Sequence, residues 1–450
     1  MATLLIKNAD VIVTMSGEKP RIEGGYVLIE GNRISAVGPG PAPPVDGATI
    51  IDAHGQVVLP GLINTHHHLY QTLTRAVPIV QNAKLFDWLK QLYPIWARIG
   101  DEGFYYAALA GMAELMLSGC TTTSDHQYLF PRGTGRILKA QIEAGRQIGI
   151  RFQPTRGSMS LSRKDGGLPP DSVVQDEDEI LADSEHIVNA YHDPAPMAMT
   201  RIALAPCSPF SVTPGLMKKT AELARHLGVR LHTHLAETSD EEQYCLDKFG
   251  RRPVDYLDEA GWLGPDVWLA HGVFFNDGEI ARLGCAGVGI AHCPSSNMRL
   301  GSGIARVKDL AQAGAAVGLG VDGSASNDSS HMLAEARQAL LLARIRCGAS
   351  AFTAWDALTL ATTGGAKCLG RDDIGAIEPG KAADLALFEL SDIGFSGNWD
   401  PVGALVFCQP TRVRTLIVNG RIVVDHGRLI TVNLEEIQER HRGIAKRLAS

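Results

Sequence analysis

Eight short apolar runs, separated by longer segments with helical periodicity, constrain the fold of this chain more than any other feature. The runs lie at residues 57–64, 121–125, 151–154, 202–205, 230–234, 267–271, 288–292 and 316–321. Candidate helices between them include residues 104–117, 134–149, 214–227 and 332–346. Alternating β and α segments are typical of a parallel sheet, and eight such units match a (β/α)8 barrel. The sequence therefore predicts an α/β protein with a TIM-like barrel over residues 60–370.

The two ends of the chain have a different pattern, with short runs of β-forming residues. These runs lie at 4–6, 11–13, 26–30 and 33–37, and again at 383–388, 413–418 and 421–425. Gly31-Asn32 and Asn419-Gly420 are tight-turn signals between neighbouring runs. We expect residues 1–59 and 371–450 to form one small composite β-sandwich domain. The polar segment 158–177 is predicted to be a long loop over the barrel mouth.

Polar residues that suit metal binding or catalysis follow four of the eight runs. They are His66-His67-His68 after the first run, His234 and Glu237 at the fifth, His271 at the sixth and Asp322 at the eighth. In an extended chain His66 and His68 point to the same side. A barrel gathers the C-terminal ends of its strands on one face, so these groups should meet there. Three histidines and an aspartate would suit a divalent transition metal and leave room for a bound water, whereas any one of these histidines alone would more often be a core residue.

Composition excludes several other classes of protein. A net charge of −7 offers no basic footprint for nucleic acid. No stretch of about 18 uncharged apolar residues predicts a membrane span, and residues 1–10 do not resemble a secretory signal. The eight cysteines are scattered without Cys-x-x-Cys pairs, which is typical of reduced thiols in a cytoplasmic protein.

Six segments carry a resemblance to a known family. They are Pro60 to Leu69, His232 to Thr238, His271-Gly272, His292 to Asn297, Val321 to Gly323 and the closing Gly375 to Asp384. In order and content they are similar to the successive motifs of the amidohydrolase superfamily, in its branch of mononuclear deaminases and chlorohydrolases. The resemblance covers nearly the whole chain and implies the same barrel and composite sandwich.

The resemblance also implies a metal site and a homo-oligomer. The implied ligands are His66, His68, His234 and Asp322, with Glu237 and His271 as further catalytic groups. No lysine follows His126 in a way that suggests the carbamylated bridge of the two-metal branches. We therefore expect one divalent ion, zinc in the first instance and ferrous iron as the alternative.

The types of these residues suggest a mechanism. A divalent ion lowers the pKa of bound water, and Asp322 would accept the water's proton and pass it to a leaving amine. Glu237 would protonate a ring nitrogen of the substrate, and His271 would hold the attacking water or polarise the developing oxyanion. The alternative for Glu237 is a surface carboxylate in the acidic run 237–242.

The expected partner is a small heterocyclic substrate. Gln71 presents a donor and an acceptor to the edge of a heterocycle, and related enzymes use a glutamine here. His126, Tyr128, Cys207 and Ser324 follow other strands and are candidates for further contacts, although each would also fit a plain loop role. Trp88 would be an aromatic wall or a core residue.

Three classes of function stay open. The first is deamination of an aminated purine or pterin, and His67, residues 70–72 and residues 125–128 look most similar to deaminases that convert 8-oxoguanine to urate and ammonia, with guanine and isoxanthopterin as alternatives. The second is hydrolysis of an s-triazine with loss of chloride or an alkylamine. The third is a protein whose metal is purely structural, which the supply of a general acid argues against.

Overall fold

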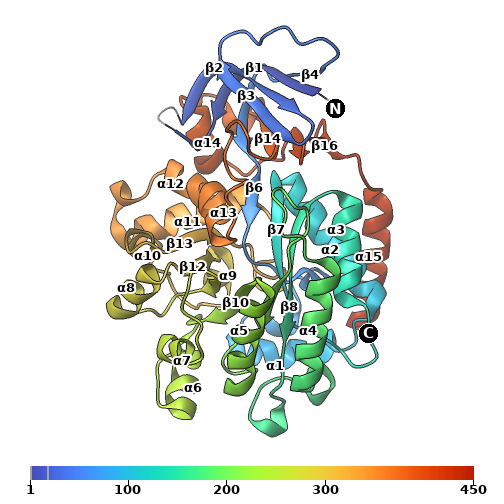
Figure 1. Cartoon of the computed structure of the whole chain (residues 1–450), viewed down its shortest axis with the longest axis vertical. Helices are drawn as coiled ribbons and strands as arrows, with labels where there is room; N and C mark the ends of the chain where they lie inside the picture. Colours follow the sequence, from blue (N-terminus) through green and yellow to red (C-terminus); the bar gives the residue numbers. More distant parts are fainter. Residues whose placement is uncertain (1–2, 18–19) are drawn as a thin grey trace.

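The computed structural model describes residues 3–17 and 20–450, and these form two sheets (Figure 1). One is an eight-stranded parallel sheet in the order β13-β12-β11-β10-β9-β8-β7-β6. Its strands are β6 (Leu62–Asn64), β7 (Cys120–Gln127), β8 (Arg151–Ser158), β9 (Ala203–Pro206), β10 (Arg230–Leu235), β11 (Val267–His271), β12 (Gly289–His292) and β13 (Ala316–Leu319). The amide of Thr65 donates to the carbonyl of Leu319 at 2.8 Å and so joins the first strand to the last. The predicted barrel is confirmed.

Helices surround the barrel, and its strands are buried on both faces, as the apolar runs in the sequence require (Figure 1). The helices are α1 (Leu85–Trp96), α2 (Asp101–Leu117), α3 (Ile137–Ile148), α4 (Glu177–Tyr191), α5 (Pro214–Leu227), α6 (Ser239–Phe249), α7 (Pro253–Glu259), α8 (Asp277–Cys285), α9 (Pro294–Arg299), α10 (Val307–Gln312), α11 (Met332–Cys347), α12 (Ala354–Thr359), α13 (Gly365–Cys368), α14 (Pro401–Phe407) and α15 (Leu434–Ala449). Residues 159–176 form a loop with two short 3-10 turns, within the segment 158–177 that was predicted as a loop. The guanidinium of Arg163 in this loop donates to the carbonyl of Lys90 on α1 at 3.2 Å.

The two ends of the chain build the second sheet, which has nine strands within the described residues. Eight of them follow the order β17-β16-β15-β14-β5-β1-β2-β3, and β4 pairs with β1. Their bounds are β1 (Thr3–Val13), β2 (Arg21–Glu30), β3 (Arg33–Pro39), β4 (Thr49–Asp52), β5 (Gln56–Pro60), β14 (Leu385–Glu389), β15 (Thr415–Val418), β16 (Arg421–Asp425) and β17 (Arg428–Leu429). Asn419 and Gly420 both have positive φ, as a two-residue hairpin turn requires. The predicted domain built from both termini is confirmed, as one mixed sheet.

Alternation along the strands divides the second sheet into two faces. Val57 and Phe388 point toward the barrel and belong to its core. Val58 and Leu387 point the other way and belong to a separate small core. The sheet therefore packs on the barrel with one face and encloses its own core with the other. The division into residues 1–59 with 371–450 and 60–370 remains our proposal for the domain limits.

The first apolar run, predicted as one strand over residues 57–64, is in fact two strands in two different sheets. β5 pairs with β1 and β14, whereas β6 pairs with β7 in the barrel. Between them the amide of Gly61 donates to the carbonyl of Asp384 at 2.8 Å. A Cβ at Gly61 would lie 2.1 Å from Oγ1 of Thr121, so only glycine permits this close passage from one sheet to the other.

The C-terminal helix α15 was not predicted. It packs against α2 and the 3-10 turn η1 (Leu69–Thr74), on the side of the barrel (Figure 1). Nε2 of His441 lies 3.1 Å from Oγ1 of Thr72, four residues beyond His68. The last helix thus contacts the turn that follows the predicted metal-binding histidines.

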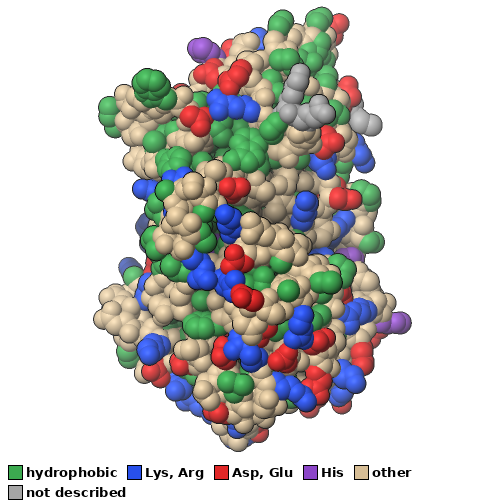
Figure 2. All heavy atoms as spheres, turned by 90° about the vertical axis from the view of Figure 1, so that its left-hand side faces the viewer, with side chains coloured by type: hydrophobic (Ala, Val, Ile, Leu, Met, Phe, Trp, Pro, Cys, Tyr) green, Lys and Arg blue, Asp and Glu red, His purple; other side chains and the backbone are tan. Residues whose placement is uncertain are grey.

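The molecular surface carries both signs of charge. Figure 2 shows Lys and Arg side chains interspersed with Asp and Glu on the face that it presents. Such a mixed field differs from the single-signed basic patch that binds nucleic acid. In the described parts of the chain no helix is long and apolar enough to cross a membrane. The expectation that residues 1–10 are not a secretory signal includes residues 1–2, which lie outside the described residues.

Candidate active site

The polar residues predicted at the strand ends meet at the end of the barrel away from the terminal sheet. His66 and His68 follow β6, His234 lies in β10, and Asp322 follows β13. His271, the last residue of β11, and Asp322 have φ of 74° and 59°. Left-handed backbone at non-glycine residues costs free energy and is typical of functional sites. The chain turns sharply at these positions and directs the side chains toward one point.

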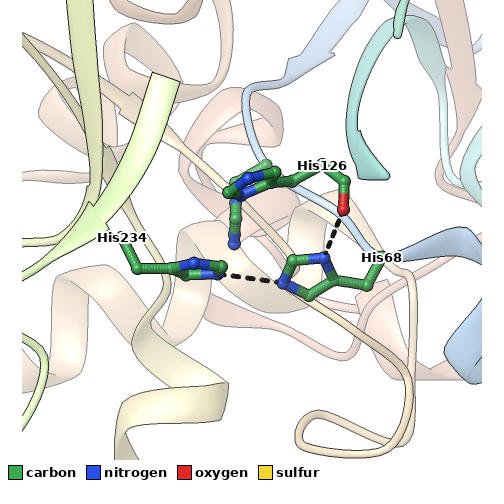
Figure 3. A group of neighbouring side chains, drawn as sticks. His68, His126 and His234 are labelled. Carbon is green, nitrogen blue, oxygen red and sulfur yellow. Dashed lines mark hydrogen bonds between the residues drawn. The ribbon is translucent and has the colours of Figure 1, made fainter. Parts of the chain in front are cut away.

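Four buried side chains form the centre of the site. Nε2 of His68 lies 3.1 Å from Nε2 of His234, and Figure 3 shows these two rings facing each other. Oδ1 of Asp322 lies 3.3 Å from Nε2 of both His66 and His68. These separations suit ligands that share one ion at about 2 Å. The side chains of the predicted ligand set are therefore brought together.

Hydrogen bonds fix the tautomer of each histidine in this centre. Nδ1 of His68 lies 2.9 Å from the carbonyl of His126, and Nδ1 of His234 lies 2.7 Å from the carbonyl of Cys207. A carbonyl only accepts, so both Nδ1 atoms carry the proton and both Nε2 atoms present a lone pair.

His66 is held in the same tautomer by a relay of two hydrogen bonds through His232. Nδ1 of His232 lies 2.8 Å from the carbonyl of Trp268, so His232 carries its proton there and its Nε2 accepts. That Nε2 lies 2.8 Å from Nδ1 of His66, which must donate. Nε2 of His66 is therefore also a lone pair, and it has no hydrogen-bond partner among the described residues.

Three lone pairs and a carboxylate converge on one point, and this arrangement fits a cation. Acceptors only 3.1–3.3 Å apart repel one another unless a proton or a metal ion lies between them. Burial lowers the pKa of His66 and His234 well below the usual imidazole value and so disfavours the extra proton. The buried cluster could therefore hold a metal ion.

Two other histidines lie around the cluster. His126 holds His68 through its carbonyl, and its ring stacks on His234 with centroids 4.6 Å apart. Its Nε2 donates to the carbonyl of Ala205 at 2.9 Å. Nδ1 of His271 donates to Oδ1 of Asn297 at 3.0 Å, which directs Nε2 toward the carboxylates.

Glu237 is buried beside the cluster and is not a surface residue of the acidic run. Its side chain lies 3.6 Å from Nε2 of His271, which is also 3.9 Å from Oδ2 of Asp322. Glu241 accepts hydrogen bonds from the amides of Ala236 and Glu237, each at 2.9 Å, and so fixes this turn. Burial, and next the charge of Asp322, raise the pKa of Glu237 to about 8. A carboxyl group that keeps its proton near neutrality can act as an acid.

Two hydroxyl groups hold the carboxylate of Asp322. Oγ of Ser296 donates to Oδ2 of Asp322 at 2.6 Å, and Oγ of Ser326 donates to the same oxygen at 3.1 Å. Because Oδ2 is held in this way, Oδ1 is directed toward His66 and His68.

A cavity of about 30 Å³ adjoins the cluster. It is lined by His68, Gln71, Leu85, Trp88, Leu89, Tyr93, Tyr128, Cys207, Phe210, His234, Glu237, His271, Leu300, Asp322 and Ser326. Of the predicted substrate contacts, Gln71, Tyr128 and Cys207 line it, as does Trp88. The other two lie outside the lining: His126 is behind His234, and Ser324 pairs with the hydroxyl of Ser330 at 3.2 Å.

Sequence reasoning missed several residues of the site. Tyr93 and Leu300 reach the cavity from α1 and from the end of α9, which no strand-end argument could indicate. Ser326 lies two residues beyond Ser324, and the sequence could not tell which hydroxyl the loop directs inward. His232 alternates with His234 on β10, and the His-Thr-His pattern was the available signal.

Comparison with known proteins places the chain in a family. The family model described as "Amidohydrolase family" matches residues 57–423. The chain belongs to the amidohydrolase family. It is therefore an enzyme, and the buried cluster lies where its fold positions catalytic groups.

Individual relatives span the whole length of the chain. It is 53% identical over 448 residues to an 8-oxoguanine deaminase of Pseudomonas aeruginosa, covering 100% of this chain and 99% of that protein. It is 36% identical to a hydroxydechloroatrazine ethylaminohydrolase of Pseudomonas sp. (strain ADP), covering 100% of this chain and 96% of the relative. The crystal structure of atrazine chlorohydrolase TrzN from Arthrobacter aurescens TC1 complexed with zinc is 33% identical, with a TM-score of 0.94 over 98% of this chain and 100% of that chain.

Proposed function

We propose that this enzyme converts 8-oxoguanine and water into urate and ammonia. The observation that carries the proposal is the buried cluster of three imidazole lone pairs and a carboxylate, with the buried acid Glu237 beside it at the same cavity. This arrangement suits hydrolysis of an amidine carbon in a heterocycle. The identity of 53% with an 8-oxoguanine deaminase over the full chain supports the choice of substrate.

We assign His66, His68, His234 and Asp322 as ligands of one divalent cation. When bound, such an ion lowers the pKa of a coordinated water toward neutrality. Zinc is the ion that we propose, supported by the nitrogen-rich donor set and by the zinc in the related chlorohydrolase structure, and ferrous iron is the alternative.

In the proposed reaction Asp322 and Glu237 move protons in opposite roles. Asp322 accepts a proton from the water that attacks the carbon bearing the 2-amino group. Glu237 protonates the neighbouring ring nitrogen, which makes that carbon more electrophilic. The proton on Asp322 then passes to the amine, the carbon–nitrogen bond breaks and ammonia leaves, while the new hydroxyl group on that carbon gives its proton to the Glu237 carboxylate and becomes the carbonyl.

His271 is suited to orient the water and stabilise charge on its oxygen. Its Nδ1 is held by Asn297, and its Nε2 lies between Glu237 and Asp322 at 3.6 and 3.9 Å. A group fixed in advance at the point where charge develops contributes without reorganisation.

The cavity must widen before a bicyclic base can enter. Its volume of about 30 Å³ corresponds to one or two water molecules. The wall away from the cluster is formed largely by α1, which Figure 1 shows at the end of the barrel opposite the terminal sheet. We therefore propose that the side chains with which α1 lines the cavity move to admit the base. The homo-oligomeric state and the cytoplasmic location that we expect from the sequence are separate proposals.

Ammonia release from a panel of purines, pterins and triazines tests this function, with chloride and alkylamine release followed in parallel. We expect 8-oxoguanine to have the highest kcat/KM, and Glu237→Gln to lower turnover by at least about 100-fold, the scale of general acid catalysis. Asp240→Asn, in the same acidic run but exposed, is the matched control and should keep full activity.

Different outcomes would point to different functions. Far faster turnover of guanine or isoxanthopterin would replace the substrate but keep the deaminase mechanism. Chloride or alkylamine release as the fastest reaction would identify a triazine hydrolase. A zinc-loaded protein that acts on none of these compounds would favour a structural metal.

A further inference from the structure

Helix α1 supplies four of the residues that line the cavity beside the proposed metal-binding cluster. Leu85, Trp88 and Leu89 present apolar surface there. The indole Nε1 of Trp88 donates to the carbonyl of Ala325 at 3.2 Å, so its polar atom is already used. Tyr93 lies on the same helix, and unlike Trp88 it has a polar side-chain atom that does not form such a hydrogen bond.

The hydroxyl group of Tyr93 is buried and makes no hydrogen bond of good geometry within the described part of the chain, the candidate partner being the hydroxyl group of Tyr128. Burial raises the pKa of this phenol well above its usual value, so it stays a donor at neutral pH. A buried donor without an acceptor destabilises the protein, whereas phenylalanine would fill the same space without that cost. The hydroxyl group therefore indicates a ligand with an acceptor.

Tyr93 reaches the cavity from α1, whereas the residues of the cluster reach it from the strand ends. The polar groups that influence the hydroxyl group of Tyr93 are those of Cys207, Tyr70 and Tyr128. The ring of Tyr128 in turn lies 5.1 Å from the ring of His68. Tyr128 thus lies close both to the cluster and to the hydroxyl group of Tyr93.

A bicyclic substrate would span the cavity from the cluster to Tyr93. With the carbon that bears the 2-amino group at the cluster, the oxygen on the five-membered ring of 8-oxoguanine lies at the opposite end of the molecule. That oxygen is a carbonyl acceptor, and guanine has no oxygen at this position. The thiol of Cys207 lines the same region but is only a weak donor.

We propose that Tyr93 determines the preference of this enzyme for an oxidised purine, by donating a hydrogen bond to the carbonyl oxygen of the five-membered ring. The inference rests on the proposed function and adds a residue that reads the oxidised position. Guanine would leave this hydroxyl group buried without an acceptor, and the site would therefore disfavour guanine.

Tyr93→Phe tests the assignment, because it removes only the hydroxyl group. We expect kcat/KM for 8-oxoguanine to fall about tenfold, the scale of one hydrogen bond, with kcat/KM for guanine nearly unchanged. Tyr256→Phe is the matched control, since Tyr256 is also buried with a hydroxyl that no described residue pairs, yet it lies on α7 outside the cavity lining. The control should not change the ratio of the two substrates.

Product inhibition gives a second measurement, which does not require the variant to turn over either substrate. Urate keeps the five-membered-ring carbonyl, whereas xanthine, the product from guanine, lacks it. The ratio of their inhibition constants should shift about tenfold toward xanthine in Tyr93→Phe. If Tyr93→Phe weakens activity and binding equally for both substrates and both products, or weakens neither, the role of Tyr93 is refuted. The proposed function would still stand. A wild-type enzyme that releases ammonia from neither base would overturn the proposed function and this inference with it.

Discussion

Replacement of His232 should weaken metal binding although His232 is not itself a proposed ligand. Nε2 of His232 accepts from Nδ1 of His66 at 2.8 Å and thereby keeps the lone pair of His66 on Nε2. His232→Phe preserves the ring that stacks on Trp268, with centroids 4.4 Å apart, but removes the acceptor. We expect the affinity for zinc to fall about 10- to 100-fold.

The magnitude follows from what His66 loses. Its Nδ1 proton would be left buried without an acceptor, at a cost of about 1–3 kcal/mol. The alternative is to move the proton to Nε2, which removes the lone pair that would bind the ion. The metal-free variant can take the second arrangement, whereas metal binding requires the first, so the cost enters the dissociation constant. At about 1.4 kcal/mol per factor of ten it corresponds to roughly 5- to 140-fold.

Zinc titration of the metal-free variants in competition with a chromophoric chelator would measure this change, with circular dichroism as the check on folding. His232→Gln, whose side-chain oxygen can still accept from His66, should restore most of the affinity. His292→Phe is the control for loss of a buried histidine at a strand end. If folded His232→Phe binds zinc as tightly as the wild type, the relay does not set the tautomer of His66.

Three other substitutions test separate features. Gly323→Ala should lower kcat/KM about tenfold or more without unfolding, because a Cβ there would lie 1.9 Å from Oε1 of Gln71 and displace its carboxamide; steady-state kinetics with unchanged kcat/KM would contradict this. Arg151→Met should lower the free energy of unfolding by about 3–5 kcal/mol, because the buried carboxylate of Asp384 loses hydrogen bonds of 3.0 and 3.1 Å; urea denaturation showing less than about 1 kcal/mol would refute the role of the pair. Burial lowers the pKa of His441 to about 4, so its contribution of about 3 kcal/mol is present above pH 6.5 and lost as the pH falls toward 4. His441→Asn should flatten that part of the stability profile in urea denaturation at several pH values, and an unaltered profile would count against it.

The barrel could be predicted because its strands are buried on both faces and so appear as continuous apolar runs. The same property explains the error at residues 57–64. β5 and β6 are both fully buried, so hydrophobicity is continuous across Gly61 although the two strands belong to different sheets. The point where the chain passes from one sheet to the other is marked only by the close approach of Thr121 to Gly61. That contact joins segments distant in sequence, so the sequence does not reveal it.

The centre of the site was predictable for a related reason. Strand ends of a barrel converge, so His66, His68, His234 and Asp322 could be placed together without knowing any loop. Residues from helices and loops could not be placed in this way. Tyr93 reaches the cavity only because of how α1 lies across the barrel end, and Ser326 replaces Ser324 only because of the local turn after Asp322.

The passage from β5 to β6 has a consequence for how the enzyme is made. On the ribosome the first histidines emerge early, but the strand that leads to them cannot complete its pairing until Leu385 to Glu389 have been synthesised, because β14 is the neighbour of β5. Asp322 likewise arrives late, and its amide then binds the carbonyl of His66. A nascent chain therefore carries two of the proposed ligands, His66 and His68, beyond an unfinished strand for most of its synthesis. If the cluster binds a metal as proposed, it should acquire the ion late in synthesis, once β14 has paired with β5.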